Sequence, residues 1–342
     1  MSNARNLANL LGTGTQVTTA DIADGVFQAN KNILINSDFQ VWQRGTTATY
    51  TTTASKFIAD RWKIRSTGTA TVTSSQQSFA VGQTDVPNNP KYYYRWDITS
   101  YTAGNGLFHQ RIEDVAKHSG QTLTFSFWAK CNSSQNITTQ YYQHFGTGGS
   151  TGVSTSGSTF ALTTSWQKFT ETVAIPSASG KTISGNDDYL FVQFIMPAAV
   201  CTIDIAQCQL EIGSTATPFE HRSYGDELAR CQRYYFKILS TSSADAFAVG
   251  QNNTTLRADG SLGFPVTMRA SPTAIETTGT ATDYLINTVG SNYTCNAVPS
   301  FIRANFQNAY FRFPTAGTIP AGSGAMLRAA VSGAYLAWSA EV

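Results

Sequence analysis

The sequence predicts an all-β protein with two β-sandwich domains, joined by a short helix and preceded by a separate N-terminal segment. Charged residues make up only 13% of the 342 residues, against roughly 25% in typical soluble domains. Aromatic residues reach 12%, and threonine, serine and glycine fill the stretches between apolar runs. From about residue 32 onward, apolar and polar residues alternate with period two, which is the pattern of a half-buried strand.

The N-terminal segment is predicted to comprise residues 1–30. Leu7, Leu10 and Leu11 have the i, i+3, i+4 spacing of a helix, and the sequence GTGTQVTT then ends that pattern. The segment has too few apolar residues for a core of its own, so we expect it to dock on another surface or to stay loose.

The first sandwich is predicted over residues 31–222. In the stretch KYYYRWDI, Tyr94 and Trp96 fall on one face of a strand, while Tyr93 and Arg95 fall on the other. Stretches rich in glycine, serine and asparagine separate such strands at the spacing of a two-sheet sandwich.

The helix is predicted over residues 223–237, because Ser223 followed by Asp226 and Glu227 is a typical helix start. Residues 238–342 then form a second β region with its own turn sequences. Their number is normal for a small sandwich.

Charge and hydropathy argue against several kinds of partner. The net charge is +2 and no block of lysine or arginine occurs, so we expect no nucleic-acid binding. No stretch approaches the roughly 18 to 20 apolar residues that span a bilayer, and the first residues lack a secretory signal. We therefore expect that the chain is synthesised in a cytosol and does not insert into a membrane. The five cysteines include no CxxC pair, which predicts buried free thiols.

No catalytic motif has its required context. The stretch 148–152 reads GxSxG, but no helix follows it as a nucleophile elbow requires. A glycosidase needs two carboxylates facing each other across a sugar, and nothing local marks such a pair. The acids that could supply one are Glu113, Asp114, Asp187, Asp188, Asp204 and Glu220. The chain is therefore predicted not to be an enzyme.

Four stretches between Ile33 and Gly213 resemble carbohydrate-binding modules of the jelly-roll type. They are ILINSDFQVWQRG, GQTLTFSFWAK, SWQKFTETVAI and CTIDIAQCQLEIG. The resemblance implies a jelly roll in which NSDFQVWQRG forms the first strand and its exit turn, with Phe39 packing inward. It also makes Asp38 and Asp204 candidate ligands of a structural calcium. Gln40 departs from the glutamate that the family often has there, whereas calcium prefers several charged oxygen ligands. No other cofactor is implied.

A narrower resemblance links the chain to tail fibre and receptor-binding proteins of tailed bacteriophages. It rests on the stretches 57–62, 217–235, 263–273 and 334–341, of which CQRYY and FPVTMRASP are the strongest. It implies a homotrimeric virion tail protein, assembled in the host bacterial cytoplasm and attached to other tail proteins through residues 1–30. Such a protein would bind host surface polysaccharide for adsorption. The alternatives are a glycan depolymerase and a purely structural component of the tail or capsid surface.

A sugar site is predicted on the strand faces that point away from the core. Aromatic rings stack on sugars, and polar side chains on the same face replace water. The predicted glycan-binding residues are Tyr93, Arg95, Trp128, Tyr142, His144 and Gln193. The alternative is that a partner subunit or a neighbouring domain covers this face, because aromatic residues are also enriched at interfaces.

Overall fold

The structure is a computed structural model that describes residues 30–51 and 53–342. The chain divides into two compact units, Met1–Lys31 and Asn32–Val342, and every element below belongs to the second unit. The predicted attachment segment, residues 1–30, lies outside the described residues except for Asn30. The described chain is almost entirely β, which confirms the predicted fold class.

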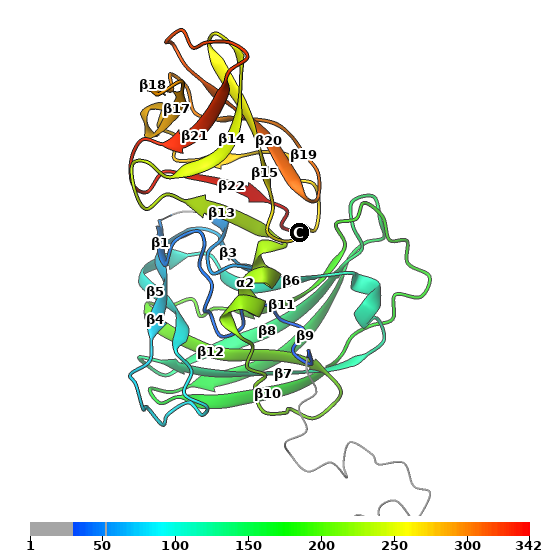
Figure 1. The fold of residues 1–342 in the computed structure, drawn as a ribbon. Helices are drawn as coiled ribbons and strands as arrows, with labels where there is room; N and C mark the ends of the chain where they lie inside the picture. Colours follow the sequence, from blue (N-terminus) through cyan, green and yellow to red (C-terminus); the bar gives the residue numbers. More distant parts are fainter. Residues whose placement is uncertain (1–29, 52) are drawn as a thin grey trace, which may run out of the picture. The chain divides into compact units, whose positions relative to one another are not determined.

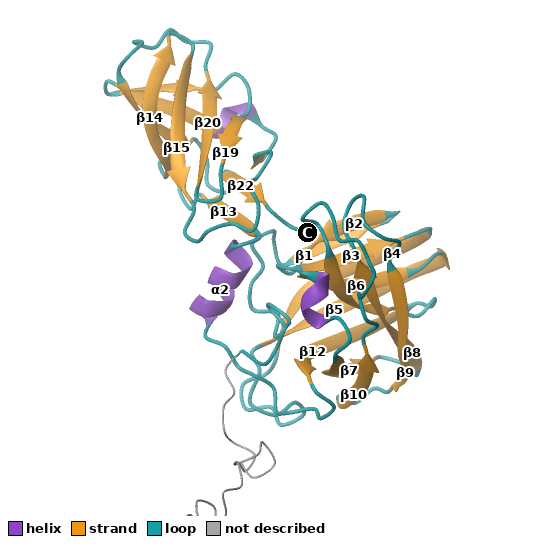
Figure 2. Cartoon of the chain, turned by 90° about the vertical axis from the view of Figure 1, so that its right-hand side faces the viewer, coloured by secondary structure: helices purple, strands orange, loops and turns teal. Residues whose placement is uncertain are grey.

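The first sandwich consists of two antiparallel six-stranded sheets (Figures 1 and 2). Sheet 1 contains, in spatial order, β1 (Thr47–Tyr50), β4 (Thr69–Ser78), β5 (Tyr92–Ala103), β12 (Cys201–Ile212), β7 (Thr122–Cys131) and β10 (Gln167–Ala174). Sheet 2 contains β2 (Ala54–Phe57), β3 (Trp62–Ser66), β6 (Gly106–Glu113), β11 (Tyr189–Ile195), β8 (Gln135–His144) and β9 (Val153–Leu162). A short 3-10 helix, η1 (Val115–His118), follows β6.

The core of this sandwich is aromatic and draws on both sheets. Tyr94 of β5 stacks on Phe108 of β6 with ring centroids 4.0 Å apart, and Trp62 lies 4.8 Å from Phe108 on its other side. Phe125 of β7 packs on Phe194 of β11, and all of these rings are fully buried. Each such ring contributes about 1.5–3 kcal/mol through burial. All five cysteines are buried and free, as predicted.

Residues 33–45 are not a strand, so this part of the prediction was wrong. Asn36 and Phe39 have φ angles of 54° and 58°, in the left-handed region, which lies outside the φ range of a regular strand. The side-chain amide of Asn36 closes the resulting loop. Its Nδ2 donates to the backbone carbonyls of Val41 (2.7 Å) and Asp60 (3.0 Å), and its Oδ1 accepts from the backbone amide of Val41 (2.9 Å). Phe39 is fully buried, as predicted.

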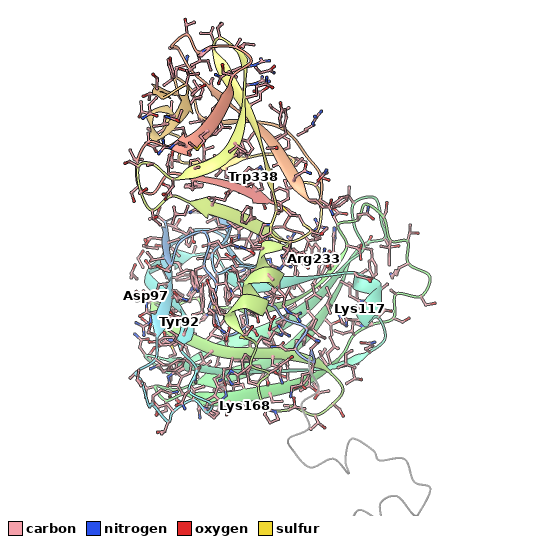
Figure 3. The ribbon with its side chains drawn as sticks, viewed as in Figure 1. Tyr92, Asp97, Lys117, Lys168, Arg233 and Trp338 are labelled. Atoms are coloured by element: carbon pink, nitrogen blue, oxygen red, sulfur yellow. The ribbon has the colours of Figure 1, made fainter. Side chains whose placement is uncertain are left out.

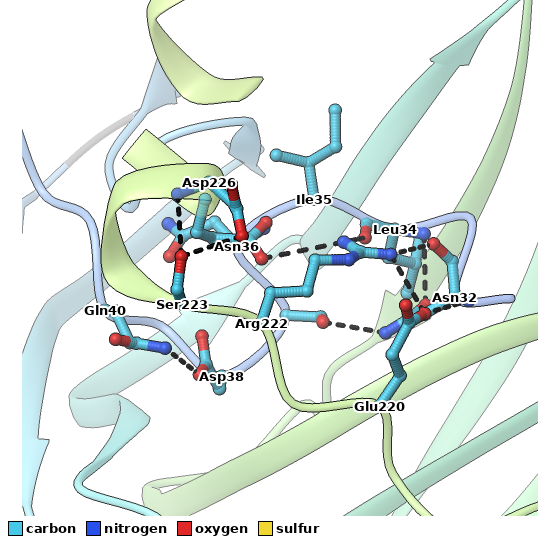
Figure 4. Close-up of polar contacts among 12 residues, drawn as sticks. Asn32, Leu34, Ile35, Asn36, Asp38, Gln40, Glu220, Arg222, Ser223 and Asp226 are labelled. Carbon is cyan, nitrogen blue, oxygen red and sulfur yellow. Dashed lines mark hydrogen bonds and ion pairs between the residues drawn. The ribbon is translucent and has the colours of Figure 1, made fainter. Parts of the chain in front are cut away.

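This loop is held by the segment that precedes the helix (Figure 4). Arg222 Nη1 donates to the Leu34 carbonyl (2.8 Å), and the Glu220 carboxylate accepts from the Asn32 amide (2.7 Å). The backbone amide of Asn36 donates to the buried Glu227 carboxylate. These hydrogen bonds therefore hold the backbone of residues 32–36 against the segment 220–227.

The helix α2 (Tyr224–Gln232) starts where the sequence predicts. Ser223 is its N-cap: the hydroxyl accepts from the Asp226 amide (3.1 Å) and donates to the Asp226 carboxylate (2.7 Å). The predicted helical range 223–237 is too long, because β13 begins at Tyr235 and pairs with the last strand. Among the described residues, no helix is long and apolar enough to cross a membrane.

The second sandwich also packs two sheets around an aromatic core. The smaller sheet contains β13 (Tyr235–Leu239), β22 (Tyr335–Ser339) and β16 (Glu276–Thr277). The larger contains β18 (Ser291–Thr294), β17 (Tyr284–Thr288), β21 (Gly324–Ala329), β14 (Ala246–Thr254), β15 (Arg257–Gly263), β20 (Asn308–Pro314) and β19 (Ser300–Ala304), with η2 (Ala281–Asp283) before β17. Trp338 (Figure 3) and Phe311 lie fully buried in this core, 5.6 Å apart.

A buried ion cluster joins the two sandwiches, and we call it the Glu341 junction: Arg44, Arg61, Tyr234, Tyr235 and Glu341. The Glu341 carboxylate pairs with Arg61 and lies 3.3 Å from Arg44 Nη2. Arg61 and Arg44 each lie 3.5 Å above a tyrosine ring, Tyr234 and Tyr235 respectively.

The stretch 263–273 also reaches this region. Within it, Arg269 Nε donates to the Ala340 carbonyl (2.8 Å), next to Glu341. The four stretches that carry the resemblance to phage tail proteins therefore meet at the Glu341 junction.

Candidate functional site

The outer face of sheet 2 carries a continuous row of rings, which we call the aromatic strip: Tyr142, His144, Tyr189 and Phe191. Alternate residues of β11 enter the core, so Tyr189 and Phe191 lie on the outer face, beside β8. Phe191 stacks on Tyr142 with centroids 5.3 Å apart and planes 29° apart. His144 lies 4.8 Å from Tyr189. Tyr142, His144 and Phe191 are only half-buried, so their faces can receive a ligand.

A glycine makes room for the tyrosine of this strip. A Cβ atom at Gly152 would lie 2.0 Å from the Tyr142 hydroxyl oxygen, so any side chain there would displace the ring. Gly152 is the last residue of the GxSxG stretch, which leads into β9 and is followed by no helix. Gly152 in this stretch therefore leaves the space in which the Tyr142 ring packs.

Two amides lie on the same face as the rings. Gln193 Nε2 of β11 donates to Gln140 Oε1 of β8 over 3.1 Å. Gln193 is 5% exposed, whereas Gln140 is half-buried. Their remaining donor and acceptor capacity is available to a polar ligand stacked on the strip.

A buried histidine supports the strip from the neighbouring strand. His109 of β6 is 4% exposed and lies 5.3 Å from the Phe191 ring. Within the described part of the chain, neither of its ring nitrogens has a hydrogen-bond partner. Burial, assisted by the positive charges of Arg111, Lys63 and Arg65, lowers the pKa of His109 to about 3. The imidazole is therefore neutral near pH 7.

This shift predicts an acid-sensitive stability. In the unfolded chain His109 binds a proton below its usual pKa of about 6.5, but in the folded chain it does so only near pH 3. Stability is therefore complete above pH 6.5 and falls as the pH drops toward 3, by about 2 kcal/mol between pH 7 and pH 5. Urea unfolding of the wild type and His109→Gln at both pH values checks this.

We expect the variant to lose about 2 kcal/mol less than the wild type over that interval. His118 and His221, whose pKa values burial also lowers, contribute equally to both proteins. Equal losses in the two proteins would contradict the buried, neutral state of His109.

Three cations continue the face beyond the rings, and we call them the basic strip: Lys63, Arg65 and Arg111. Lys63 of β3 pairs in register with His109, and Arg111 lies two residues further along β6. The Arg111 guanidinium lies 4.3 Å from the Tyr189 ring. Within residues 30–51 and 53–342, none of these three cations forms an ion pair with a carboxylate.

The six residues predicted to bind glycan do not form one surface. Tyr142, His144 and Gln193 lie together on the outer face of sheet 2. The other three, Tyr93, Arg95 and Trp128, lie on β5 and β7 of sheet 1. Alternation correctly places each residue opposite the core of its own strand, but it does not reveal which sheet the strand joins.

The outer face of sheet 1 has its own aromatic cluster. Tyr93 lies 4.8 Å from Phe79 and 5.4 Å from Trp166. Arg95 forms a two-pronged ion pair with Asp204, at 2.7 and 2.9 Å. Arg95 therefore has a carboxylate partner within the chain.

Three residues of the sheet 2 face, namely Phe191, His109 and Arg111, were missed in the sequence. Phe191 lies between Tyr189 and Gln193 in the same alternation, so its outward position was readable from the period alone. His109 and Arg111 lie in LFHQRIE, whose alternation is clear only once Phe108 and Ile112 are known to be core residues.

The two predicted calcium ligands do not fit a calcium site. Asp204 is paired with Arg95, and Lys130 lies 3.7 Å from its second oxygen. The Gln40 side-chain amide donates to Asp38, and burial raises the pKa of that acid. Within the described residues, no group of three or more His, Cys, Asp or Glu side chains could hold a metal ion. Calcium needs several oxygen ligands.

The acids considered for catalysis hold the structure together. Asp188 accepts from the Val115 amide (2.7 Å), and Asp114 accepts from the Lys117 amide in η1. Glu113 pairs with Arg233 (2.9 Å), and Asp187 accepts from the backbone and hydroxyl of one threonine. Each therefore has a local structural partner.

No family model and no curated protein matches this chain. Among solved structures, it is similar to the enzymatically active domain of tailspike protein 4 of bacteriophage CBA120, with 16% identity and a TM-score of 0.35 over 54% of this chain and 22% of that one. The xylan-binding domain CBM22-2 of Paenibacillus barcinonensis Xyn10C has 18% identity and a TM-score of 0.30, over 45% of this chain and 92% of that one.

A family 11 carbohydrate-binding module of Clostridium thermocellum, in complex with a mixed-linked tetrasaccharide, has 13% identity and a TM-score of 0.31. This match covers 46% of the present chain and 91% of the module. All three similarities are distant.

Proposed function

We propose that the chain is a phage tail protein that binds host surface polysaccharide on the outer face of sheet 2 and does not cut it. The observation that carries the proposal is the aromatic strip, whose half-buried rings lie on two neighbouring strands beside a pair of amides. The resemblance of four stretches to phage tail proteins supports the virion role.

The geometry of the strip suits a sugar chain. Neighbouring strands lie about 4.8 Å apart, so Tyr142 and Phe191 form one nearly continuous apolar surface. The CH faces of a pyranose can stack on that surface, while its hydroxyls reach the amides of Gln140 and Gln193. Because the rings are already held by Gly152 and His109, little ordering is needed on binding.

The acids beside the strip are unsuited to glycoside cleavage, which needs a general acid with a raised pKa. Burial alone would raise the pKa of Glu113, but its ion pair with Arg233 brings the pKa below the usual value. Hydrogen bonds from Thr147 lower the pKa of Asp187. Both acids are therefore ionised near neutral pH, which supports binding without catalysis.

The remaining parts of the proposal concern assembly. Residues 1–30 would attach the chain to other tail proteins, and a homotrimer with many copies per particle would supply avidity from modest single sites. A purely structural tail or capsid component is the alternative, and it predicts no affinity for any glycan.

The test measures binding of the full-length protein to polysaccharide extracted from bacterial surfaces. We expect Tyr142→Ala to weaken binding at least about tenfold, which is about 1.4 kcal/mol. Tyr93→Ala, a matched change on sheet 1, tests the rival face: if it weakens binding and Tyr142→Ala does not, the assignment to sheet 2 is wrong. Release of new reducing ends during incubation would establish the depolymerase instead.

A further inference from the structure

The basic strip lies beside the aromatic strip on one continuous surface. Residues Lys63, His109, Gln193 and Gln140 are successive register partners across β3, β6, β11 and β8. Two strand spacings, about 10 Å, therefore separate the cations of β3 from the rings of β11. A sugar chain running across the strands would meet both strips.

We propose, on the basis of the proposed function, that the glycan held on this face is anionic, a polysaccharide carrying carboxylate or phosphate groups. The aromatic strip would stack on its sugar rings, and the basic strip would bind its acidic groups. The net charge of the whole chain is only +2 and does not by itself indicate an anionic ligand.

The first argument is that these three neighbouring cations lack the carboxylate partners that several arginines of the described chain have. Arg95 pairs with Asp204, Arg312 with Asp259 and Arg233 with Glu113, each within 2.9 Å. In the described chain, the basic strip has no comparable carboxylate. Glu341 and Asp187 offset part of the charge at Arg111, but both are already held by other groups.

The second argument is mutual repulsion. Burial lowers the pKa of Lys63, and the charges of Arg111 and Arg65 lower it further. Among the described residues, compensation for Lys63 comes from the negative charge of Glu341, which is already paired with two arginines, and from the Phe57 ring, 5.1 Å from the ammonium nitrogen. Three like charges gathered on one face are unfavourable in the free protein, so a bound anion would relieve that repulsion.

The third argument is a set of buried polar atoms without partners. Arg111 Nε and both ring nitrogens of His109 have no hydrogen-bond partner among the described residues. A guanidinium matches the geometry of a carboxylate or phosphate with two parallel hydrogen bonds. A neutral imidazole offers one donor and one acceptor, which suits a sugar hydroxyl next to that acidic group.

The experiment compares full-length wild type with Lys63→Gln/Arg65→Gln, in which no ion pair is lost. The matched control is Lys117→Gln/Lys168→Gln, which removes two exposed charges, one in η1 and one in β10 of sheet 1; both residues are labelled in Figure 3. The probes are polygalacturonate, alginate, hyaluronate, polysialic acid and a phosphomannan, with carboxyl-reduced forms of the first four. Neutral xylan, mixed-linked β-glucan and galactan, and a single-stranded DNA oligonucleotide, complete the set.

We expect binding to at least one acidic polysaccharide, loss of that binding on carboxyl reduction or dephosphorylation, and roughly tenfold weaker binding by Lys63→Gln/Arg65→Gln. The control should bind like the wild type, and salt should weaken the wild type more than the charge variant. Binding confined to neutral glycans and abolished by Tyr142→Ala would overturn the anionic ligand while leaving the proposed function intact. Tighter binding of DNA than of any glycan would overturn it in favour of nucleic acid. No glycan binding at all would remove both proposals.

Discussion

Replacing Glu341 by alanine is expected to lower the free energy of unfolding by about 3–5 kcal/mol, because it leaves the buried Arg61 without its carboxylate and leaves Arg44 with only the Asp60 carboxylate, 3.9 Å away. Arg61 is 1% exposed and Arg44 is largely covered, and both contact Glu341. The tyrosine rings beneath them stabilise cations only weakly compared with an ion pair. Urea unfolding followed by tryptophan fluorescence measures the change.

Two further variants separate charge from packing at this junction. Glu341→Gln keeps the shape and the hydrogen-bonding oxygen but removes the charge, so most of the loss should persist. Arg61→Met/Glu341→Leu removes a buried pair together and should be more stable than Glu341→Ala. A loss below about 1 kcal/mol for Glu341→Ala would show that water or other groups already solvate the arginines.

Replacing Phe191 by alanine should weaken glycan binding more than any other single change in the aromatic strip, by about 30-fold or about 2 kcal/mol. Phe191 is the central ring: it contacts Tyr142, His109 and Tyr189, with centroids 5.3, 5.3 and 6.2 Å away. Its removal deletes one stacking surface and lets the neighbouring rings tilt. Isothermal titration with the polysaccharide found in the binding screen measures the loss.

Phe191→Leu is the matched control for this prediction. Leucine restores much of the apolar contact over His109 but offers no flat ring to a sugar. If stacking is the cause, Phe191→Leu recovers stability without recovering affinity. Equal affinity of Phe191→Leu and wild type would show that Phe191 only supports its neighbours.

The local features of this protein were readable from residue order. The period of two correctly assigned core faces in β5, β7 and β11, because a pleated strand turns alternate side chains to opposite sides. Ser223 predicted the start of α2, because a hydroxyl cap acts on an amide only three residues away. These rules use neighbours along the chain, so they need no knowledge of the fold.

The loop at residues 36–45 could not be read from the sequence. The resemblance of NSDFQVWQRG to an opening strand predicted a strand, yet Asn36 and Phe39 adopt left-handed backbone angles. The hydrogen-bond partners that stabilise this conformation include Asp60 and Glu227, which are distant in the sequence. Tertiary hydrogen bonds therefore decide the backbone conformation of this segment.

By itself, the sequence determined the all-β class, the inward face of most strands and the presence of outward aromatic residues. Only the tertiary structure decided that Tyr142, His144 and Gln193 share a surface with Phe191, while Tyr93, Arg95 and Trp128 lie on the other sheet. It also brought Glu341 to Arg44 and Arg61. The physical reason is that side-chain alternation is a property of one strand, whereas strand order depends on hydrogen bonds between segments far apart in the chain.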